Sequence, residues 1–419
     1  MLDIHRLRED PQGIEKRLRT CDPSIRLDKI LELDRRRLAL IQEVEAIKAE
    51  RNRGSQEVGR LKKEKKDATA LIASLATLGE RLASLDREHK EIASRIDGLL
   101  ALLPNVPHAS VPVGDKTEKV ILRTHGEVPQ VDFPIVHHLE IAEQKGLLDF
   151  KTAAAIAGAR FPMYVGAGAR LEMALIEFMF FRHADNGFVP ILPPFLANAQ
   201  SFYVSSQLPK FSDDIYHCEK DDLYLNPTAE SLLANLHRDK ILAAEDLPLR
   251  YVAYTPCFRR EAGSYGEEER GLIRVHQFNK VEMFTFTTPE ESYAELDRLI
   301  GHAEGVLEAL GLHYRVALLA TGDIAQQSAK TVDLEVWLPG QNRYYEVSSC
   351  SNCEDFQARR GNTRYRPASG EKPLYVHTLN GSGLATSRLL AAILENNQTA
   401  AGQVRVPEVL RERVGGEFL

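Results

Sequence analysis

Two long heptad seams near the N-terminus constrain the fold of this chain more than any other feature. One can be written over residues 30–61 and the other over 71–103, and the seam positions in both alternate steps of three and four residues. The segment Lys62–Thr69 between them can reverse the chain. The pattern therefore predicts an antiparallel helical hairpin roughly 50 Å long at 1.5 Å per residue.

The distal part of this hairpin is basic. Residues 48–66 hold eight Lys or Arg against three Glu, although the whole chain has a net charge of −7. A basic surface of this kind suits a phosphate backbone, but a coiled coil can equally be a solvated spacer or a dimerisation rod. Pro104 and Pro107 then end the second helix.

Composition indicates a cytoplasmic protein of several domains. The chain has 419 residues, 43% of them hydrophobic, so two or three domains are expected. Its five cysteines are scattered and odd in number, which suits a reducing compartment. We find no signal-peptide pattern and no apolar run of membrane-span length, so no membrane association is expected.

A pair of strands in the second half of the chain presents an unusual polar face. Strands are predicted at Tyr251–Phe258 and Ile273–Thr287, with a glycine-rich charged loop between them. Alternation predicts that one face of the second strand carries Arg274, His276, Phe278, Lys280 and Glu282. Forked arginine donors and a stacking ring could seat a nucleotide, although polar strand faces often only meet water.

A glycine-bearing segment near the C-terminus leads into a helix. Asn380–Ala385 precedes Thr386 and Ser387, which are expected at the helix start, and Arg388 then falls in the first turn. The helix dipole disfavours a cation there, so a nearby anion would remove the conflict; otherwise Arg388 is a solvated arginine. The segment lacks the third glycine of a dinucleotide-binding fingerprint.

A further hairpin is predicted from Val332–Leu338 and the segment that begins at Arg343, across a Pro-Gly turn. Glu346 beside serine hydroxyls could hold Mg²⁺, which prefers hard oxygen ligands. Glu346 and Ser349 are three residues apart, so a shared ligand requires a bulge or the end of the strand. Another polar segment, Asn226–Glu230, follows a short strand-like run at residues 222–225.

Taken in this order, these segments resemble the bacterial-type seryl-tRNA synthetases, a family of class II aminoacyl-tRNA synthetases, over essentially the whole chain. The marks are Phe258–Glu261 with Arg274–Phe278, the triplet Thr228–Glu230, Glu346–Asp355, and Asn380–Arg388. The resemblance implies an α+β fold with a class II antiparallel sheet, flanking helices and an N-terminal coiled-coil arm. It implies a tRNA-binding domain at 1–110 with its arm at about 28–103, a linker at 111–118 and a catalytic domain at 119–419.

The resemblance implies ATP-dependent activation of L-serine and transfer to tRNA(Ser), and also to tRNA(Sec). The residues it places on the reacting groups are Arg259, Glu346 and Arg388. Arg259 would bind the α-phosphate and the serine carboxylate, Phe278 and Arg388 would sandwich the adenine, and Glu346 with Ser349 would hold Mg²⁺. The full ATP-binding set is Arg259, Arg260, Glu261, Arg274, Phe278, Glu346, Val347, Ser348, Ser349 and Arg388. No general base is needed, since a carboxylate is already a nucleophile.

Serine recognition is assigned by the same resemblance to Thr228, Ala229, Glu230, Arg259, Glu282 and Ser382. Thr228 and Glu230 would meet the ammonium group, and Glu282 and Ser382 the hydroxyl. Thr228 has an alternative role as a cap of the helix that starts at Glu230. His276 is as readily a bystander as a ligand contact.

The remaining expectations concern macromolecular partners and metals. The arm would contact tRNA through Lys48, Arg51, Arg53, Arg60, Lys62 and Lys63. The helix Leu171–Asn186 with Gly187–Pro194 resembles the class II motif that forms a homodimer interface. Cys350 and Cys353 form a single CxxC with no second pair, so no zinc is expected. Two features leave the contacts with the tRNA acceptor stem undecided. They are the acidic run Glu267–Glu269 and Arg260, which stands where the family often has serine.

Two other functions are compatible with parts of the pattern. A ligase that charges a carrier protein would lack the long basic arm, so the arm argues against it. An RNA-binding relative without catalysis would not need the arginine, glutamate and phenylalanine set of the nucleotide site.

Overall fold

The computed structural model of the protein describes residues 1–262, 271–368 and 370–419. Its described residues form two compact units, one made of residues 2–19 and 23–103 and the other mainly of residues 104–419. Residues 104–118 thus group with the larger unit, and the domain boundaries drawn at 110 and 118 stay a prediction. The acidic run Glu267–Glu269 lies outside the described residues.

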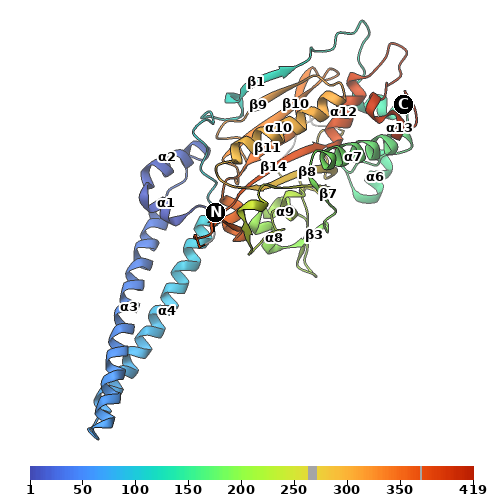
Figure 1. The fold of residues 1–419 in the computed structure, drawn as a ribbon. Helices are drawn as coiled ribbons and strands as arrows, with labels where there is room; N and C mark the ends of the chain where they lie inside the picture. The colour runs from blue at the N-terminus through green and yellow to red at the C-terminus, as the bar shows by residue number, and fades with distance from the viewer. Residues whose placement is uncertain (263–270, 369) are drawn as a thin grey trace. The chain divides into compact units, whose positions relative to one another are not determined.

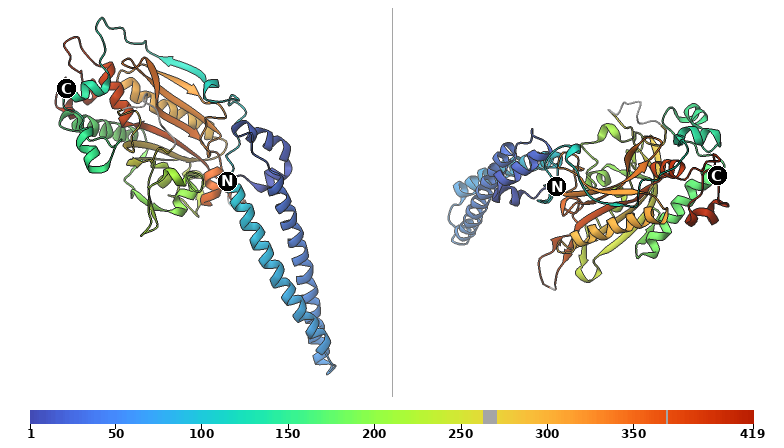
Figure 2. Two further views of the ribbon diagram at one scale, coloured as in Figure 1. Left: turned by 180° about the vertical axis from the view of Figure 1, so that it is seen from behind. Right: turned by 90° about the horizontal axis from the view of Figure 1, so that it is seen from above.

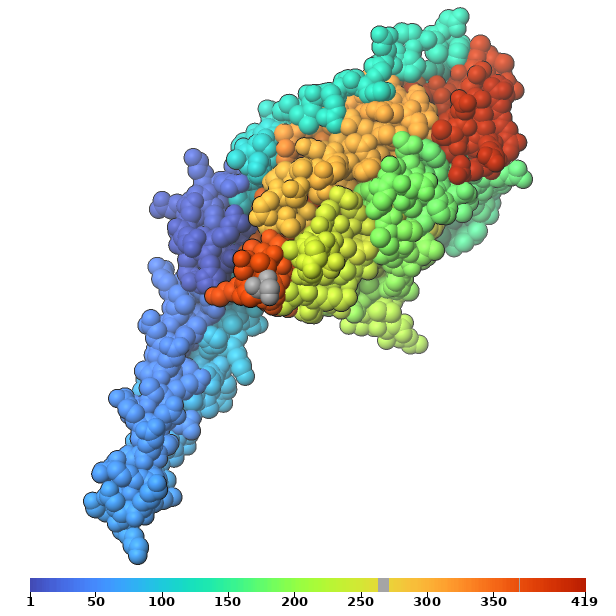
Figure 3. All heavy atoms as spheres, viewed as in Figure 1, coloured from blue at the N-terminus to red at the C-terminus, as the bar shows by residue number. Residues whose placement is uncertain are grey.

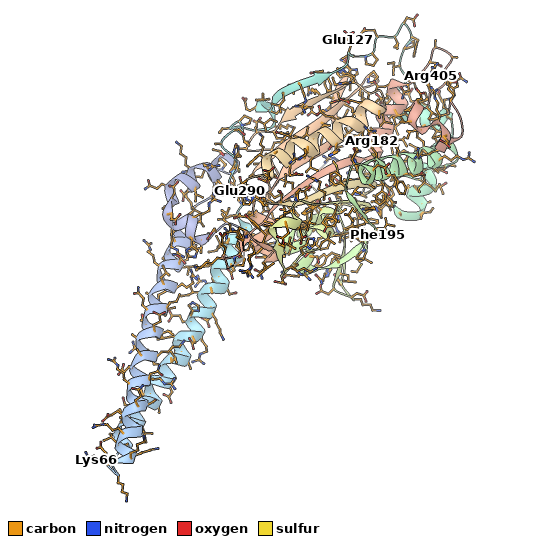
Figure 4. The ribbon with its side chains drawn as sticks, viewed as in Figure 1. Lys66, Glu127, Arg182, Phe195, Glu290 and Arg405 are labelled. Carbon is orange, nitrogen blue, oxygen red and sulfur yellow. The ribbon has the colours of Figure 1, made fainter. Side chains whose placement is uncertain are left out.

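The smaller unit contains the predicted helical hairpin. After α1 (Ile4–Glu9) and α2 (Pro11–Cys21), the long helices α3 (Asp28–Lys63) and α4 (Thr69–Leu102) run antiparallel and side by side (Figure 1). The chain reverses between Lys63 and Thr69, as predicted, and the turn carries Lys66, labelled in Figure 4. The heptad pattern alone therefore located this element, because its contacts lie between neighbouring helices.

The seam residues of the hairpin are buried far from the turn and become more exposed near it. Ile30, Leu40 and Ile47 of α3 are buried, as are Ile92 and Ile96 of α4. Gly54 interrupts the seam in sequence, but a Cβ placed there would lie 2.6 Å from Leu75 Cδ2. The glycine thus allows α3 and α4 to approach closely at a point where a larger residue would push them apart.

The larger unit is built on a sheet of eight strands in the order β1-β9-β10-β11-β14-β8-β7-β2. All neighbours are antiparallel except β2 and β7. The strands are β1 (Val120–His125), β9 (Tyr314–Leu318), β10 (Lys330–Leu338), β11 (Arg343–Asn352), β14 (His377–Ala385), β8 (Gln277–Thr287), β7 (Leu249–Phe258) and β2 (Val189–Ile191). This is the predicted α+β arrangement.

Three helices form the main core with this sheet: α7 (Ala167–Asp185), α10 (Ser292–Ala309) and α12 (Thr386–Asn396). In the space-filling view, α10 side chains cover the sheet on that side (Figure 3). Seen from behind, the central strands face the viewer without a described helix over them (Figure 2). One face of the sheet therefore makes the core and the other is free to carry polar side chains.

Shorter elements complete this unit. They are α5 (His138–Gln144), α6 (Phe150–Ala157), α8 (Ala199–Val204), α9 (Glu230–Leu233), α11 (Phe356–Gly361) and α13 (Arg411–Val414), with two small sheets, β3 (Leu196–Asn198), β5 (Leu223–Leu225) and β4 (His217–Cys218), and β13 (Leu374–Tyr375), β12 (Arg364–Arg366) and β6 (Ile241–Ala243). Among the described residues, 3₁₀ turns lie at 116–118, 212–214, 244–246 and 408–410. Within the described ranges, no helix is both long and apolar enough to cross a membrane.

Four predicted element starts are wrong: β7 and β10 begin two residues earlier than predicted, at Leu249 and Lys330, and two other starts differ by four residues. The strand predicted from Ile273 begins only at Gln277, whose partner is Phe258 at the end of β7. The backbone N–H of His276 instead donates to Arg160 O at 2.9 Å, so the sheet ladder has ended there. The helix predicted from Leu171 starts at Ala167, because Gly166 with a φ of 51° precedes it.

Two β-bulges shape the polar face. Leu334 pairs with Ser348 and Glu335 with Glu346, which leaves Val347 as an extra residue in β11. A second bulge in β14 leaves Gly383 between Ser382 and Leu384. A ligand shared by Glu346 and Ser349 was expected to require a bulge, because residues three apart in a regular strand lie on opposite faces. The bulge at Val347 lies between them and brings both onto one face.

Candidate active site

A pocket opens where β8, β11 and β14 meet the start of α12. It is lined by Arg259, Glu261, Ile273, Arg274, Val275, Phe278, Lys280, Glu346, Val347, Ser382, Ala385, Ser387 and Arg388. Residues from four sequence segments, each singled out as polar or glycine-bearing, thus border one cavity. The convergence follows from the strand order, which places β14 between β11 and β8.

Arginine side chains dominate the pocket, and each has defined contacts. Arg259 Nε donates to Pro227 O at 3.2 Å, and its guanidinium carbon lies 5.1 Å from the centre of the Phe278 ring. Arg274 Nη1 is 3.5 Å from a carboxylate oxygen of Glu261. Phe278 is 9% exposed, so its ring is fixed by packing while it borders the pocket.

Arg388 lies in the first turn of α12, as the sequence indicated, and it has an anionic partner there. Its Nη1 donates to the Glu346 backbone oxygen at 2.8 Å and lies 3.2 Å from the Glu346 carboxylate. Its Nε donates to Ile273 O at 3.1 Å. The carboxylate offsets the unfavourable position of a cation near the N-terminus of a helix, and the contacts aim the guanidinium at the pocket.

A buried polar network lies beside this pocket. Glu282 is fully buried, its Oε2 accepts from the Thr228 hydroxyl at 3.0 Å, and it forms an ion pair with Lys280, itself only 6% exposed. Glu282 Oε1 is buried and makes no hydrogen bond with any described residue. A buried carboxylate oxygen without a donor is costly, so this atom marks a place where a ligand donor would be favourable.

Glu230 is the second buried carboxylate of the network. Its Oε1 accepts from the side-chain amides of Gln327 at 3.0 Å and Gln357 at 2.7 Å, and its Oε2 from Asn380 at 3.3 Å. Burial, and then the nearby charge of Glu282, raise the pKa of Glu230 to about 7. A cation placed between the two carboxylates would favour their ionised forms.

The remaining predicted residues occupy different surroundings. Thr228 Oγ1 donates to Glu282 and accepts from the Glu230 backbone N–H at 3.3 Å, but the N-cap position of α9 is Ala229, one residue later. Ala229 is buried. Arg260 does not border the pocket; its guanidinium lies 4.5 Å from the centre of the Tyr216 ring. His276 Nδ1 is 3.0 Å from the backbone oxygen of Arg259, and His276 does not line the pocket.

The first bulge places the candidate magnesium ligands, Glu346 and Ser349, on the same face of β11. Val347 lines the pocket, and the buried Ser348 hydroxyl donates to Ser382 O at 2.6 Å, which ties β11 to β14. Ser349 is directly opposite Asp333 of β10. Burial, and then the nearby charge of Glu346, raise the pKa of Asp333 well above its usual range, whereas a hydrogen bond from Ser349 opposes the rise.

Sequence reasoning missed several of these residues. Asp333 could have been found by pairing the strands of the 330–352 hairpin, but without the bulge the count would have placed it opposite Ser348. Gln327 and Gln357 gave no signal, since they come from a loop and from α11, both distant in sequence from Glu230. Lys280 was placed on the correct strand face but not assigned to the site.

A second hollow adjoins the first and shares Arg259 and Glu261 with it. Its other lining residues are Gln207, Phe211, Asp214, Ile215, Pro227, Ala262, Ala325 and Gln327. Arg259 therefore stands between the two hollows, and the amide of Gln327 links the second one to Glu230.

Comparison with known proteins identifies the family. Residues 1–107 match the seryl-tRNA synthetase N-terminal domain, and residues 213–397 match the tRNA synthetase class II core domain (G, H, P, S and T). The chain is 50% identical over 419 residues to the serine–tRNA ligase of Thermodesulfovibrio yellowstonii, with 99% of each chain covered.

Solved structures give the same result. Seryl-tRNA synthetase from Pyrococcus horikoshii complexed with ATP matches with a TM-score of 0.96 and 38% identity, covering 100% of this chain and 99% of that one. The cytoplasmic serine–tRNA ligase from Naegleria fowleri in complex with AMP matches with a TM-score of 0.89 and 31% identity, covering 100% and 98%. The fold is that of a class II aminoacyl-tRNA synthetase. Within that class, the chain belongs to the seryl-tRNA synthetase family.

Proposed function

We propose that this protein uses ATP to convert L-serine to seryl-adenylate, with release of pyrophosphate, and transfers the serine to the 3′ end of tRNA(Ser) and tRNA(Sec). The observation that carries the proposal is the pair of buried carboxylates, Glu230 and Glu282, beside a pocket walled by arginines and Phe278. The pocket suits a nucleotide and the carboxylates suit a small amino acid with a second polar group.

ATP fits the first pocket. The adenine stacks on Phe278 with Arg388 on its other side, where a guanidinium adds cation–π attraction. Glu261 reads the adenine edge and Arg274 meets the terminal phosphates. Arg259, between the two hollows, is placed to bind both the α-phosphate and the serine carboxylate. Charge that develops on the phosphate during attack is then met by fixed donors.

Magnesium fits the oxygen ligands on the bulged part of β11. The Glu346 side chain is 45% exposed and Ser349 shares its face because of the extra residue Val347. Carboxylate and hydroxyl oxygens are the ligands that Mg²⁺ prefers. When bound, the ion would neutralise charge on the phosphates. Asp333, which lies opposite Ser349, orients the Ser349 hydroxyl.

Serine fits the buried network. Its ammonium group lies against Glu230 and Thr228, and its hydroxyl donates to Glu282 Oε1, the atom that has no donor among the described residues. Ser382 lies beside Glu282, its partner across the β8–β14 ladder. Alanine would leave Glu282 Oε1 unpaired, so a site of this kind rejects it more strongly than size alone allows.

Transfer RNA fits the hairpin arm. The side chains of Lys48, Arg51, Arg53, Arg60, Lys62 and Lys63 are exposed on α3. Arg60 is paired with Glu57 at 2.7 Å and is still 61% exposed, so it can exchange that partner for a phosphate. Contacts of this kind read backbone charge and shape, which allows two tRNAs with long variable arms to share the arm.

A homodimer fits the apolar surface of α7 and the segment that follows it. Met173 and Phe181 of α7 are 60% and 51% exposed, and Val189 and Leu192 are 54% and 74% exposed. Large exposed side chains of this type, gathered on one helix and the adjoining edge strand, are typical of a subunit interface. We also propose a tRNA-binding domain at residues 1–110, a linker at 111–118 and a catalytic domain at 119–419.

Serine-dependent ATP–pyrophosphate exchange, followed by charging of purified tRNA(Ser) and tRNA(Sec), tests this function. Exchange with serine, little exchange with alanine or threonine, and stable charging are expected. Exchange without charging of any tRNA would favour a carrier-protein ligase, and tRNA binding without exchange would favour a non-catalytic relative. Either result would overturn the proposal.

A further inference from the structure

A further buried carboxylate, Glu172, lies in the larger unit and has no part in the chemistry described above. It is on α7 and is only 3% exposed. Its Oε1 accepts from Asn279 Nδ2 at 2.8 Å and is also bonded to the Thr386 hydroxyl. Burial raises the pKa of Glu172 to about 7, and these hydrogen bonds oppose the rise. Placing a carboxylate there is costly, so its two partners are informative.

Both partners adjoin the walls of the nucleotide pocket. Asn279 is next to Phe278 in β8, and its Oδ1 accepts from the Tyr254 hydroxyl at 3.0 Å, which fixes the orientation of its amide. Thr386 is the first residue of α12, two positions before Arg388. Thr386 Oγ1 also lies 3.1 Å from Asn279 O, so the three residues form a closed triangle.

We propose that Glu172 is a positioning residue that holds Phe278 and Arg388 at the correct separation for a nucleotide base, through Asn279 on one side and Thr386 on the other. The inference rests on the proposed function, since it concerns the same ATP pocket. Glu172 links one helix, one strand and the start of a second helix at a single oxygen atom.

The physical reason is the short path from this oxygen to each wall. Successive residues in a strand point to opposite faces, so any displacement of Asn279 on the core side moves Phe278 on the pocket side. Thr386 fixes the first turn of α12, which has no side-chain cap of its own. Arg388 extends from that turn. A displacement of about 1 Å at a binding group can cost up to about 100-fold in rate.

The effect is expected to fall more on ATP than on serine. Glu230 is held by Gln327 and Gln357, and neither amide contacts the Glu172 triangle. Loss of the triangle therefore leaves the ammonium site in place. A general loss of stability would instead lower the amount of active protein and would not single out the KM for ATP.

Exchange kinetics at varied ATP and saturating serine test this proposal. Glu172→Ala is expected to raise the KM for ATP by roughly 10- to 100-fold, with a smaller change in the KM for serine. Glu172→Gln keeps the Oε1 acceptor and should stay within about threefold of the unmodified protein. Glu177→Ala is the matched control, because Glu177 is on the same helix but bonds Arg413 at 3.0 Å, outside the triangle.

Thr386→Val provides a second route, since it removes the hydroxyl at similar volume and decides the question if Glu172→Ala does not fold. It should raise the KM for ATP to a similar extent, and adding Glu172→Ala should increase it little further. An unchanged KM for ATP in folded Glu172→Ala or Thr386→Val, or a Glu172→Gln variant as impaired as Glu172→Ala, would overturn the proposal.

Calorimetric binding of Mg–ATP separates this inference from the proposed function. The measurement needs no turnover, so it reports on the pocket even if serine-dependent exchange were absent. Weaker ATP binding in Glu172→Ala, with recovery in Glu172→Gln, supports the positioning role. Equal ATP affinity in all of these variants would contradict it.

Discussion

The pH dependence of serine binding is the sharpest consequence of the buried network. Glu230 has a pKa raised to about 7 by burial and by the charge of Glu282, with Lys280 opposing the rise. In the proposed serine site, the ammonium group of serine pairs with the ionised Glu230 carboxylate. Protonated Glu230 cannot make that ion pair, so serine should bind only the fraction of the protein in which Glu230 is ionised.

The magnitude follows from the titration. With a pKa of about 7, the ionised fraction of Glu230 is about 0.9 at pH 8 and about 0.1 at pH 6. The apparent affinity scales with the competent fraction, so the KM for serine should rise about tenfold between pH 8 and pH 6. Above pH 8 the Glu230 contribution should become flat.

The assay is serine-dependent ATP–pyrophosphate exchange between pH 6 and pH 8 at saturating Mg–ATP. Glu230→Gln is the informative variant, because it keeps the size of the side chain and removes the titration. It should bind serine more weakly at pH 8, and its KM for serine should change little with pH. A KM for serine that is flat in the unmodified protein, or that keeps its pH dependence in Glu230→Gln, would refute the reasoning.

Stability provides an independent check with a defined sign. The pKa of Glu230 rises from 4.5 to about 7 on folding, so the folded state binds more protons between these values. The contribution of Glu230 to stability is therefore lost as pH rises through this window, by about 3 kcal/mol in total at 1.36 kcal/mol per pH unit. The unfolding free energy of Glu230→Gln should fall less between pH 5 and pH 7 than that of the unmodified protein.

Three further predictions address the other parts of the molecule. Deleting Leu38–Ile92 and bridging the remaining helices should spare serine-dependent exchange and abolish tRNA charging, and loss of exchange in a folded deletion variant would contradict this division. Phe278→Ala should raise the KM for ATP by an amount equivalent to roughly 1–3 kcal/mol, and Arg388→Ala should nearly abolish exchange because stacking and charge are lost together; near-normal exchange in Arg388→Ala would count against its place beside the adenine. Glu282→Ala should remove much of the preference for serine over alanine, measured as the ratio of kcat/KM at saturating ATP, and an unchanged ratio in an active variant would show that another residue reads the hydroxyl.

The sequence by itself determined the elements whose contacts are local. The α3–α4 hairpin, the β10–β11 hairpin and the start of α12 were located by heptad spacing, alternation around a Pro-Gly turn, and a Thr-Ser pair before an apolar helix. In each case, the stabilising contacts join residues close in sequence or in adjoining elements, so the pattern carries the information.

Only the tertiary structure decided the details of the site. The start of β8 at Gln277 depends on Arg160, whose backbone oxygen takes the His276 N–H that a strand partner would otherwise use. The bulge at Val347 was required by the interpretation of Glu346 and Ser349, but its position emerged from the pairing of β10 with β11. Local sequence does not specify where a ladder ends or slips, because that depends on the competing partner.

The buried carboxylates illustrate the same limit. The family resemblance singled out Glu230, but the local pattern alone shows only a glutamate at the start of a short helix. In the structure, amides from three distant segments surround it and its pKa rises to about 7. Glu172 reads as one polar residue of an apolar helix, but it joins Asn279 and Thr386. Desolvation and hydrogen-bond partners are properties of the packed chain, so the chemistry of these groups was fixed only when the elements came together.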